Sequence, residues 1–305
     1  MNPKLLGYLR LMRPANLPTA AADILAGIAI AVAIPLNIHG FDGVSFFSVT
    51  FDNYSVLSLI FSSVLLYAGG VVLNDVFDAK LDAIERPERA IPSGLILKKN
   101  AAIFGTSLLV IGIILAFFAN MISGIIACTL AFSIVLYDAV SKNYDFLGPL
   151  NMGICRGLNL ILGITVFGTI KFPALAIIPV IYIFAITLIS RGEVHGNNKK
   201  NIIWAGILYG IVLLSLFSIN LYFDFDTLYI SIFILFFGFS IFFPLVKAYR
   251  KNSPKNIKKA VITGVLSIII LDACFVALFT YWWIGIPILL LLPLSLLLSK
   301  LFAVT

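Results

Sequence analysis

The chain has 305 residues, of which 61% are hydrophobic and 11% charged, and its mean hydropathy is +1.09. A soluble domain is about 45–50% apolar and about 25% charged, so this chain has too little polar surface for a water-soluble globule. The same composition excludes a disordered chain, a collagen-like repeat and a disulfide scaffold, because apolar content is high and only three cysteines are present. The remaining class is a polytopic membrane protein.

Apolar runs of about 20 residues, the length of a helix that crosses about 30 Å of hydrocarbon, recur along the whole chain. Their continuity excludes a β-barrel, whose strands alternate apolar and polar residues. A last apolar stretch, 284–299, follows a Trp-Trp-Ile-Gly-Ile-Pro break and is either a tenth span or a re-entrant hairpin. We therefore expect an all-α bundle in a single domain, 1–305. The nine predicted spans cover residues 16–36, 54–75, 101–119, 121–138, 148–168, 174–190, 202–222, 227–246 and 260–280.

The formal charge of +7 would suggest a nucleic-acid partner in a soluble protein, so the positions of the cations matter. All 21 Lys and Arg residues except Arg156, Lys171 and Lys300 fall on one side of this topology. By the positive-inside rule, the N-terminus and all the basic loops are then cytoplasmic. Lys300 joins them if the last stretch spans, which favours ten crossings. Membrane topology thus explains the basicity, and no nucleic-acid partner is expected.

Five of the 14 acidic residues lie within positions 75–88, where the second span meets its basic loop. If the span continues as a helix, Asn74, Asp78 and Asp82 project from one face with Asp75 beside them. Like charges at that spacing repel, so a cation is expected among them. Carboxylate oxygens suit Mg²⁺, which is typically held by one or two carboxylates while it bridges substrate phosphates.

Basic residues accompany these acids and allow two interpretations. In one, Lys80, Arg86 and Arg89 pair with the acids in a solvated turn. In the other, the arginines bind a diphosphate, since a guanidinium group can donate two hydrogen bonds to phosphate oxygens. The one-face spacing at the end of an apolar span favours the second interpretation.

A second polar segment, 190–200, follows the sixth span on the same side of the membrane. Glu193 and Asn197 are four residues apart and could face one ligand. Glu193 follows Asp78 by four spans, so the two polar segments hold equivalent positions in two four-helix units. This arrangement predicts two acidic helix ends that face each other across a cavity, each with a metal ion. His195, in the same segment, is more often a solvated loop residue than a ligand.

Three motifs carry a family resemblance that covers essentially the whole chain. Residues 74–82, in the pattern Asn-Asp-x-x-Asp-x-x-x-Asp, are followed by Arg-Pro at 86–87 and by Arg-Ala-Ile-Pro-Ser-Gly at 89–94. Residues 13–16 read Arg-Pro-x-Asn at the start of the first span, and residues 137–142 read Tyr-Asp-x-x-Ser-Lys at the end of the fourth. Together these motifs resemble the UbiA superfamily of intramembrane prenyltransferases.

The resemblance implies a bundle whose central cavity opens laterally to lipid, and transfer of an isoprenoid chain from its diphosphate to a lipophilic or aromatic acceptor. Ionising an allylic diphosphate creates a highly charged leaving group, which metal ions and preplaced cations stabilise. Aromatic faces near the ionising carbon could add about 0.5–2 kcal/mol each by cation–π attraction, with Tyr67, Phe77 and Tyr137 as candidates.

The candidate residues receive three expected roles, and some residues receive two of them. Asp75, Asp78, Asp82, Glu193 and Asn197 are the expected Mg²⁺ ligands. Asp75, Asp78, Asp82, Lys142 and Tyr137 are the expected catalytic residues. Asn16, Asn74, Arg86, Arg89, Asn151, Arg156, Arg191 and Lys199 are the expected substrate-binding residues, with Arg86, Arg89, Lys142, Arg191 and Lys199 as the diphosphate clamp.

Two positions depart from the family pattern. The second motif is usually Asp-x-x-x-Asp, whereas Glu193 and Asn197 supply one carboxylate and one amide, so the second ion should bind more weakly. Asp138 stands where the family has a small hydroxyl residue and places an ionisable group in the cavity floor. With residues 152–159, these departures resemble a divergent branch, similar to the UbiA-like proteins of Ebo metabolite clusters.

Two alternatives remain at this point. One is a non-catalytic carrier for a prenylated or aromatic precursor on the same scaffold, and the other is a secondary transporter of unrelated fold. Polar residues inside spans are costly, by about 2.5–3.5 kcal/mol for an Asp or Arg at mid-span. Two roles are open for Arg156: an ion pair with Asp23 or Asp272, or binding of the acceptor. In either case we expect all three side chains to point into the bundle. The cysteines lack Cys-x-x-Cys spacing, so neither a disulfide nor a metal–thiolate site is expected.

Overall fold

A computed structural model describes residues 2–33, 54–193, 196–223 and 227–302, and these residues form helices and no strands, which confirms the all-α class. Ten helical segments among them are long and apolar enough to cross a membrane. The stretch after the Trp-Trp break is one of the ten, so ten crossings are favoured over the re-entrant hairpin. The segments are Pro14–Ala33, Tyr54–Phe77, Lys98–Ala119, Met121–Ala139, Leu147–Phe167, Pro173–Ser190, Lys199–Tyr222, Thr227–Arg250, Pro254–Phe279 and Trp282–Leu301.

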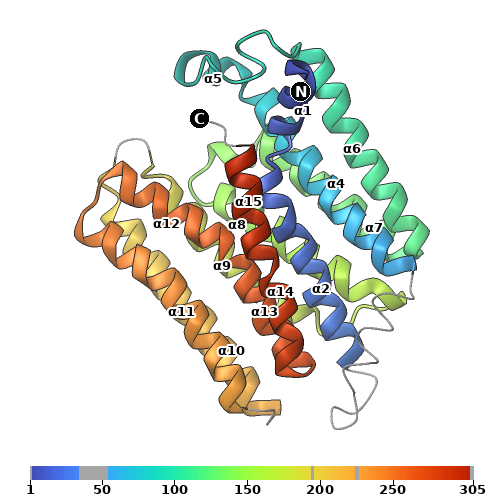
Figure 1. The fold of residues 1–305 in the computed structure, drawn as a ribbon, viewed down its shortest axis with the longest axis vertical. Coiled ribbons are helices and arrows are strands. Elements are labelled where there is room, and N and C mark those ends of the chain that lie inside the picture. The colour runs from blue at the N-terminus through green and yellow to red at the C-terminus, as the bar shows by residue number, and fades with distance from the viewer. Residues whose placement is uncertain (1, 34–53, 194–195, 224–226, 303–305) are drawn as a thin grey trace.

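Several segments consist of two or more consecutive helices. Figure 1 shows them as a bundle, with α4, α6 and α7 on one side and α10, α11 and α12 on the other. The helices are α1 (Pro3–Leu11), η1 (Pro14–Asn16), α2 (Leu17–Ala33), α4 (Tyr54–Phe77), α5 (Ala79–Glu85), α6 (Lys98–Ala119), α7 (Met121–Ala139), η2 (Ser141–Asn143), α8 (Leu147–Ile164), η3 (Thr165–Phe167), η4 (Pro173–Ala176), α9 (Ile177–Ser190), α10 (Lys199–Phe223), α11 (Thr227–Arg250), α12 (Pro254–Leu266), α13 (Ile268–Phe279), η5 (Trp282–Ile284), α14 (Gly285–Leu289) and α15 (Leu291–Leu301).

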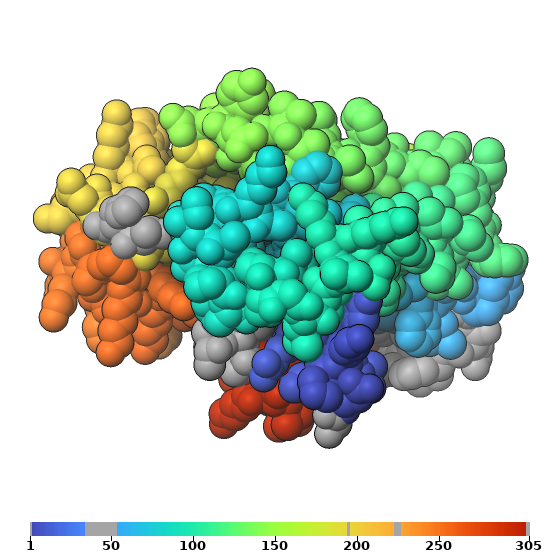
Figure 2. All heavy atoms as spheres, turned by 90° about the horizontal axis from the view of Figure 1, so that it is seen from above, coloured from blue at the N-terminus to red at the C-terminus, as the bar shows by residue number. Residues whose placement is uncertain are grey.

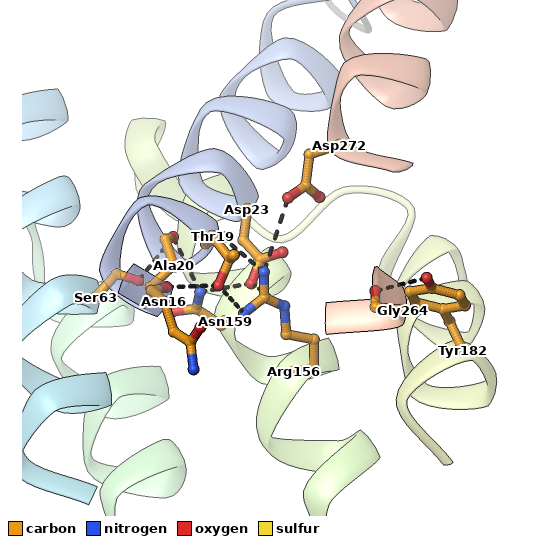
Figure 3. Close-up of polar contacts among 10 residues, drawn as sticks. All are labelled: Asn16, Thr19, Ala20, Asp23, Ser63, Arg156, Asn159, Tyr182, Gly264 and Asp272. Carbon is orange, nitrogen blue, oxygen red and sulfur yellow. Dashed lines mark hydrogen bonds and ion pairs between the residues drawn. The ribbon is translucent and has the colours of Figure 1, made fainter. Parts of the chain in front are cut away.

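Helices α2 and α13 form the centre of the bundle. Every residue of α13 is buried, and so are most residues of α2. The predicted ninth span is two helices, α12 and α13, separated at Ser267. Near this break the hydroxyl of Tyr182 donates a hydrogen bond of 2.8 Å to the carbonyl oxygen of Gly264 (Figure 3). A side chain thus supplements the backbone hydrogen bonding where the helix is interrupted.

Two glycines allow α2 and α8 to approach closely. A Cβ atom on Gly27 would lie 2.5 Å from the carbonyl oxygen of Leu160, and one on Gly163 would lie 2.6 Å from that of Ile24. Both distances are too short for any side chain. Small residues at such crossings let helix backbones pack directly against each other in a membrane protein. The contact places α8, with its polar side chains, beside α2.

The cation-rich segments gather at one end of the bundle. Helices α1 and α5 lie at the upper end in Figure 1, and α15 also ends there, which places Lys300 with them. Figure 2 looks onto this end. Residues 78–97, in teal, cover the middle of the face between α1, in blue, and the start of α12, in orange. The candidate site lies beneath and beside this segment.

Candidate active site

The acidic motif is not on one continuous helix. Helix α4 ends at Phe77, Asp78 adopts φ −82° and ψ 0°, and α5 begins at Ala79. Helical hydrogen bonding continues through the turn, because the amide of Asp82 donates to the carbonyl of Asp78 at 2.8 Å. The expectation of one uninterrupted helix was therefore wrong at a single residue, Asp78. The carboxylates contact two groups of partners, as helical spacing predicts: Asp75 and Asp82 are seven residues apart, and Asn74 and Asp78 are four apart.

Asp75 and Asp82 form the first group, and they share one arginine. Nη1 of Arg89 lies 3.3 Å from Oδ1 of Asp75 and 2.7 Å from Oδ2 of Asp82. Asp75 Oδ1 also accepts a hydrogen bond of 2.8 Å from Nη2 of Arg13. Asp75 and Asp82 are largely buried. A cation therefore lies between the two carboxylates, as the repulsion between like charges requires.

Arg13 was part of a sequence motif, but its partner was not predicted. Its backbone has φ 47° and ψ 67°, the left-handed region that a non-glycine residue rarely adopts. Pro14 follows and begins the short helix η1. This conformation joins α1 to η1 and brings the guanidinium to a carboxylate 62 residues away. Backbone strain of this kind is often found at functional sites.

Asp78 and Asn74 form the second group, with the end of α7. Nζ of Lys142 lies 2.5 Å from Oδ1 of Asp78, and it also lies over the ring of Phe77, 5.9 Å from its centroid. Nδ2 of Asn74 donates a hydrogen bond of 2.8 Å to Oδ1 of Asp138. The acidic motif and the Tyr-Asp-x-x-Ser-Lys element, more than 60 residues apart in sequence, thus meet in space.

A cavity of about 410 Å³ lies between these residues and the interior of the bundle. Its walls come from η1, α2, α4, α7, α8, α9, α12 and α13, and the lining residues of α12 and α13 are all apolar. Of the predicted site residues, it is lined by Asn16, Asn74, Tyr137 and Arg156, together with Tyr67. The other lining residues are Arg13, Thr19, Ser63, Gly70, Val71, Leu130, Ile134, Asp138, Met152, Cys155, Asn159, Ile183, Ile186, Thr187, Ser190, Val261, Val265 and Ile268.

Arg156 is the charged residue on the inner wall of the cavity, and the structure pairs it with both acids. Its Nε atom lies 2.7 Å from Oδ2 of Asp23, and its Nη2 atom lies 3.8 Å from Oδ2 of Asp272. Figure 3 shows the guanidinium between α2 and α13. Nη2 also donates to the backbone carbonyl of Thr19 at 2.6 Å. The predicted interhelical ion pair is confirmed, and a role in binding the acceptor stays a prediction.

Neutral polar groups extend this network toward α4. Nδ2 of Asn159 donates a hydrogen bond of 2.7 Å to Oδ2 of Asp23, and its Oδ1 atom accepts one of 2.7 Å from Ser63 (Figure 3). Asn151 has a different environment. Its amide donates to the carbonyl of Ser133 at 3.2 Å and to the hydroxyl of Ser141 at 3.0 Å, which ties α8 to the end of α7. The predicted contact of Asn151 with substrate is untested.

The second polar segment follows α9. Glu193 is partly buried, which raises the pKa of its carboxyl, while Lys258 on α12 and Arg86 after α5 oppose that shift. Neither Glu193 nor Asn197 is among the residues that line the cavity, so two acidic helix ends that face each other across it stay a prediction. Asn197 is exposed and has φ 55°. His195 lies outside the described residues.

The two remaining clamp candidates have partners away from Asp75 and Asp82. Arg191 pairs with the carboxylate of Asp145, and its Nη2 atom donates to the carbonyl of Tyr144 at 2.9 Å. Nζ of Lys199 lies 5.6 Å from the centroid of the Tyr249 ring on α11. All three cysteines are free thiols, as expected.

The carboxylates at the site suit Mg²⁺ by their chemistry, but they are too few to fill its coordination shell. Asp75 and Asp82 both reach the same guanidinium nitrogen, so their hard oxygen atoms approach one cation from two sides. Among the described residues no group of three His, Cys, Asp or Glu side chains could hold a metal by itself. Mg²⁺ usually takes one or two carboxylates and completes its shell with water and substrate phosphates. The residues present therefore fit Mg²⁺ that arrives with a diphosphate.

Fold and site define a multi-pass integral membrane protein whose helical bundle holds a cavity with paired carboxylates and cations at its polar end. Residues 44–266, well over half of the chain, match the UbiA prenyltransferase family. The chain belongs to this family, which confirms the predicted resemblance and excludes a transporter of unrelated fold.

A curated relative from Methanococcoides burtonii, a digeranylgeranylglyceryl phosphate synthase, is 37% identical over 172 residues. This match covers 56% of the chain and 58% of the relative, so the chain spans less than two thirds of that relative's length. A solved structure described as a digeranylgeranylglyceryl phosphate synthase aligns with a TM-score of 0.62 at 23% identity, over 90% of this chain and 98% of that one. A UbiA homologue from Archaeoglobus fulgidus bound to GPP and Mg²⁺ aligns with a TM-score of 0.59 at 16% identity, over 88% and 99%. These two alignments support the fold.

Proposed function

We propose that the chain is a Mg²⁺-dependent prenyltransferase that moves an isoprenoid chain from its diphosphate to a lipophilic acceptor within the membrane. The observation that carries this proposal is the sharing of Arg89 by Asp75 and Asp82 at the polar end of a cavity that continues into apolar walls. A molecule with a charged head and a long apolar tail matches that division. The archaeal homologue bound to GPP and Mg²⁺ gives independent support for the donor and the cofactor.

In this mechanism the acidic motif provides the metal ligands. Asp75, Asp78 and Asp82 would supply carboxylates to Mg²⁺, one or two to an ion, and the ion would supply positive charge that stabilises the diphosphate as a leaving group. Glu193 and Asn197 would hold a second ion more weakly, because Asn197 adds an oxygen atom but no charge. The arginine and lysine side chains that pair with these acids would contact phosphate oxygens when the donor binds.

The cations that would bind the diphosphate lie in two groups, one on each side of it. Arg13 and Arg89 lie with Asp75, while Lys142 lies with Asp78 across the turn. Fixed cations of this kind stabilise a leaving group without reorganising during the reaction. Arg86, Arg191 and Lys199 are further clamp candidates at the same end. Tyr67 and Tyr137, which line the cavity, would face the allylic cation, and Asn16, which also lines it, would contact the substrate.

The acceptor we propose is an alcohol of the glyceryl phosphate type that already carries one isoprenoid chain. The curated relative is named for a product with two geranylgeranyl chains on glyceryl phosphate. Such an acceptor has an apolar tail for the apolar walls and a hydroxyl group that can attack the donor. Its phosphate would lie with the cations at the polar end.

We also propose that this end of the bundle faces the cytoplasm. The segments that carry Arg13, Arg86, Arg89, Lys142 and Arg191 all lead into the polar end of the cavity. The positive-inside rule places such segments on the cytoplasmic side. Labelling of single cysteines introduced at Lys98 and at Lys171 from either side of sealed vesicles tests this orientation, since the two positions should label from opposite sides.

The test of the activity is incubation of the purified full chain in lipid nanodiscs with Mg²⁺ and labelled geranylgeranyl diphosphate. Parallel samples contain geranylgeranylglyceryl phosphate, geranylgeranylglycerol without the phosphate, or 4-hydroxybenzoate. We expect release of diphosphate with a doubly prenylated product in the first sample. Binding of donor and acceptor without any diphosphate release would contradict the proposal and favour a carrier.

A further inference from the structure

Asp138, near the C-terminal end of α7, is a buried carboxylate with one unused oxygen atom. The residue is 3% exposed. Its Oδ1 atom accepts the hydrogen bond from Asn74, whereas its Oδ2 atom is buried and has no hydrogen-bond partner among the described residues. Burying a polar atom without a partner costs free energy, so nearly all such atoms in proteins are paired. The unpaired oxygen therefore needs an explanation.

The position of Asp138 along α7 directs its side chain into the cavity. Leu130 and Ile134 precede it by two turns and one turn of helix, and all three residues line the cavity. Residues at this spacing lie on one face of a helix. The stripe is apolar at Leu130 and Ile134 and ends in a carboxylate at the polar end. Asp138 thus lies where the apolar walls meet the charged groups that would bind the diphosphate.

Asp138 is also the carboxylate that lines the cavity within the described part of the chain. Asp75, Asp78 and Asp82 each contact a cation at the mouth, and Asp23 pairs with Arg156 behind the cavity wall. None of those four is among the lining residues. Asn74 holds Oδ1 of Asp138 and leaves Oδ2 free to meet a ligand in the cavity.

We propose that Oδ2 of Asp138 accepts the hydroxyl proton of an alcohol acceptor during prenyl transfer. This inference rests on the proposed function. The acceptor oxygen forms a bond to the first carbon of the isoprenoid chain, and the bond from that carbon to the diphosphate oxygen breaks, with its electron pair leaving on the diphosphate. The hydroxyl proton moves to Asp138 and is later released to water, so the products are an ether, diphosphate and one proton.

A carboxylate is suited to this step because the acceptor is a weak nucleophile. A positioned base typically contributes about 10²–10⁴-fold to the rate of such proton transfer. Tyr137 and Cys155, which also line the cavity, carry protons of their own at neutral pH and are donors there. Asn74 is then a positioning residue, since it fixes the carboxylate and touches no reacting atom.

Several charged and titratable groups face Asp138 and enter any pH measurement. They come from each element around it: Arg13 before α2, Asn74 and Asp78 on and after α4, Tyr137 and Lys142 near the end of α7, and Cys155 on α8. A pH readout must therefore be compared between variants that leave these groups unchanged.

The experiment compares the full chain with Asp138→Asn in nanodiscs, with Mg²⁺, geranylgeranyl diphosphate and geranylgeranylglyceryl phosphate. Asparagine keeps the shape and an oxygen atom for Asn74, but it cannot take up the proton. We expect kcat for transfer to fall about 100-fold or more, with unchanged donor affinity. The residual rate should rise about tenfold per pH unit, because hydroxide then replaces the base, while the wild type shows no such slope.

Two further variants complete the test. Asp138→Glu keeps a carboxylate and should recover part of the lost kcat, and Glu88→Gln, an exposed carboxylate at the same end, should have wild-type kcat. Wild-type kcat in Asp138→Asn, or no recovery in Asp138→Glu, would overturn the inference and leave the proposed function standing. A wild-type chain that transfers no isoprenoid chain at all would overturn the proposed function, and this inference with it.

Discussion

Nζ of Lys142 lies 2.5 Å from Oδ1 of Asp78, although the two residues are 64 positions apart in the chain. The contact joins the turn after α4 to the short helix η2 after α7. It fixes a cation beside the acidic motif before any donor binds. Removing either partner therefore affects both the charge at the mouth of the cavity and the position of the turn.

Lys142→Met should lower kcat/KM for the diphosphate donor by about 10- to 100-fold, because a hydrogen bond to a charged group contributes about 1.5–3 kcal/mol. The effect should appear in donor KM as well as in kcat, since the same cation binds the ground state. Steady-state kinetics with varied donor concentration measures both. Lys98→Met, an exposed lysine at the same end, is the matched control. Equal kinetics in the two variants would show that Lys142 does not bind the diphosphate.

Gly163→Ala should destabilise the bundle by about 1–3 kcal/mol, because the added methyl group meets the backbone of α2. The midpoint of thermal unfolding in detergent, followed by circular dichroism, measures the effect. Gly210→Ala on α10 is the matched control, since a Cβ there meets nothing within 4 Å. That substitution should leave the midpoint unchanged or raise it slightly, as alanine favours helix more than glycine does. Equal midpoints for both variants would contradict the close approach of α2 and α8.

The stability of the fold should depend on pH through Glu193. Burial raises the pKa of this carboxyl above its ordinary value of 4.5. The folded state therefore favours the protonated form, and the stabilisation is complete below the ordinary pKa and is lost as pH rises through the raised one. Relative to Glu193→Gln, the wild type should lose thermal stability as pH rises above about 4.5 toward neutral. A constant difference in unfolding midpoint over that range would contradict the raised pKa.

Asn197→Asp should tighten the Mg²⁺ dependence of transfer, because it restores a second carboxylate to the second polar segment. The backbone at Asn197 has φ 55°, and aspartate tolerates this left-handed conformation nearly as well as asparagine. Titration of activity with Mg²⁺ gives the apparent dissociation constant of the ion. Glu193→Gln should weaken it. No change in either variant would indicate that the segment holds no metal.

Much of the fold could be predicted from the sequence, because hydrophobic length and cation placement are local properties of the chain. The membrane class, the all-α bundle and the spans follow from such properties. The division of the ninth span at Ser267 did not, since the contact of Tyr182 with Gly264 near the break is tertiary and leaves no local signal. The tenth span stayed open for a similar reason, because the Trp-Trp break is compatible with a turn or with a short helix.

The site was predicted less completely. The acidic motif, Lys142 and the ion pair of Arg156 could be found, because charged residues in apolar surroundings need partners. The interruption of the helix at Asp78 could not, since an Asp in a helical pattern gives no signal of a break. The contact of Arg13 with Asp75 depends on a left-handed residue before Pro14, and the unpaired oxygen of Asp138 depends on where Asn74 points. Such features exist only once the helices have packed.

The most direct measurement is release of diphosphate from labelled geranylgeranyl diphosphate, together with product formation, by the wild type, Asp78→Ala and Asp82→Ala. Glu85→Gln, an exposed carboxylate on α5, is the control. We expect Mg²⁺-dependent turnover in the wild type and the control, abolished by EDTA and by either alanine variant, with membrane insertion intact in all four proteins. Wild-type turnover in both alanine variants, or turnover that survives complete removal of Mg²⁺, would contradict the assignment of the acidic motif as a metal–diphosphate site.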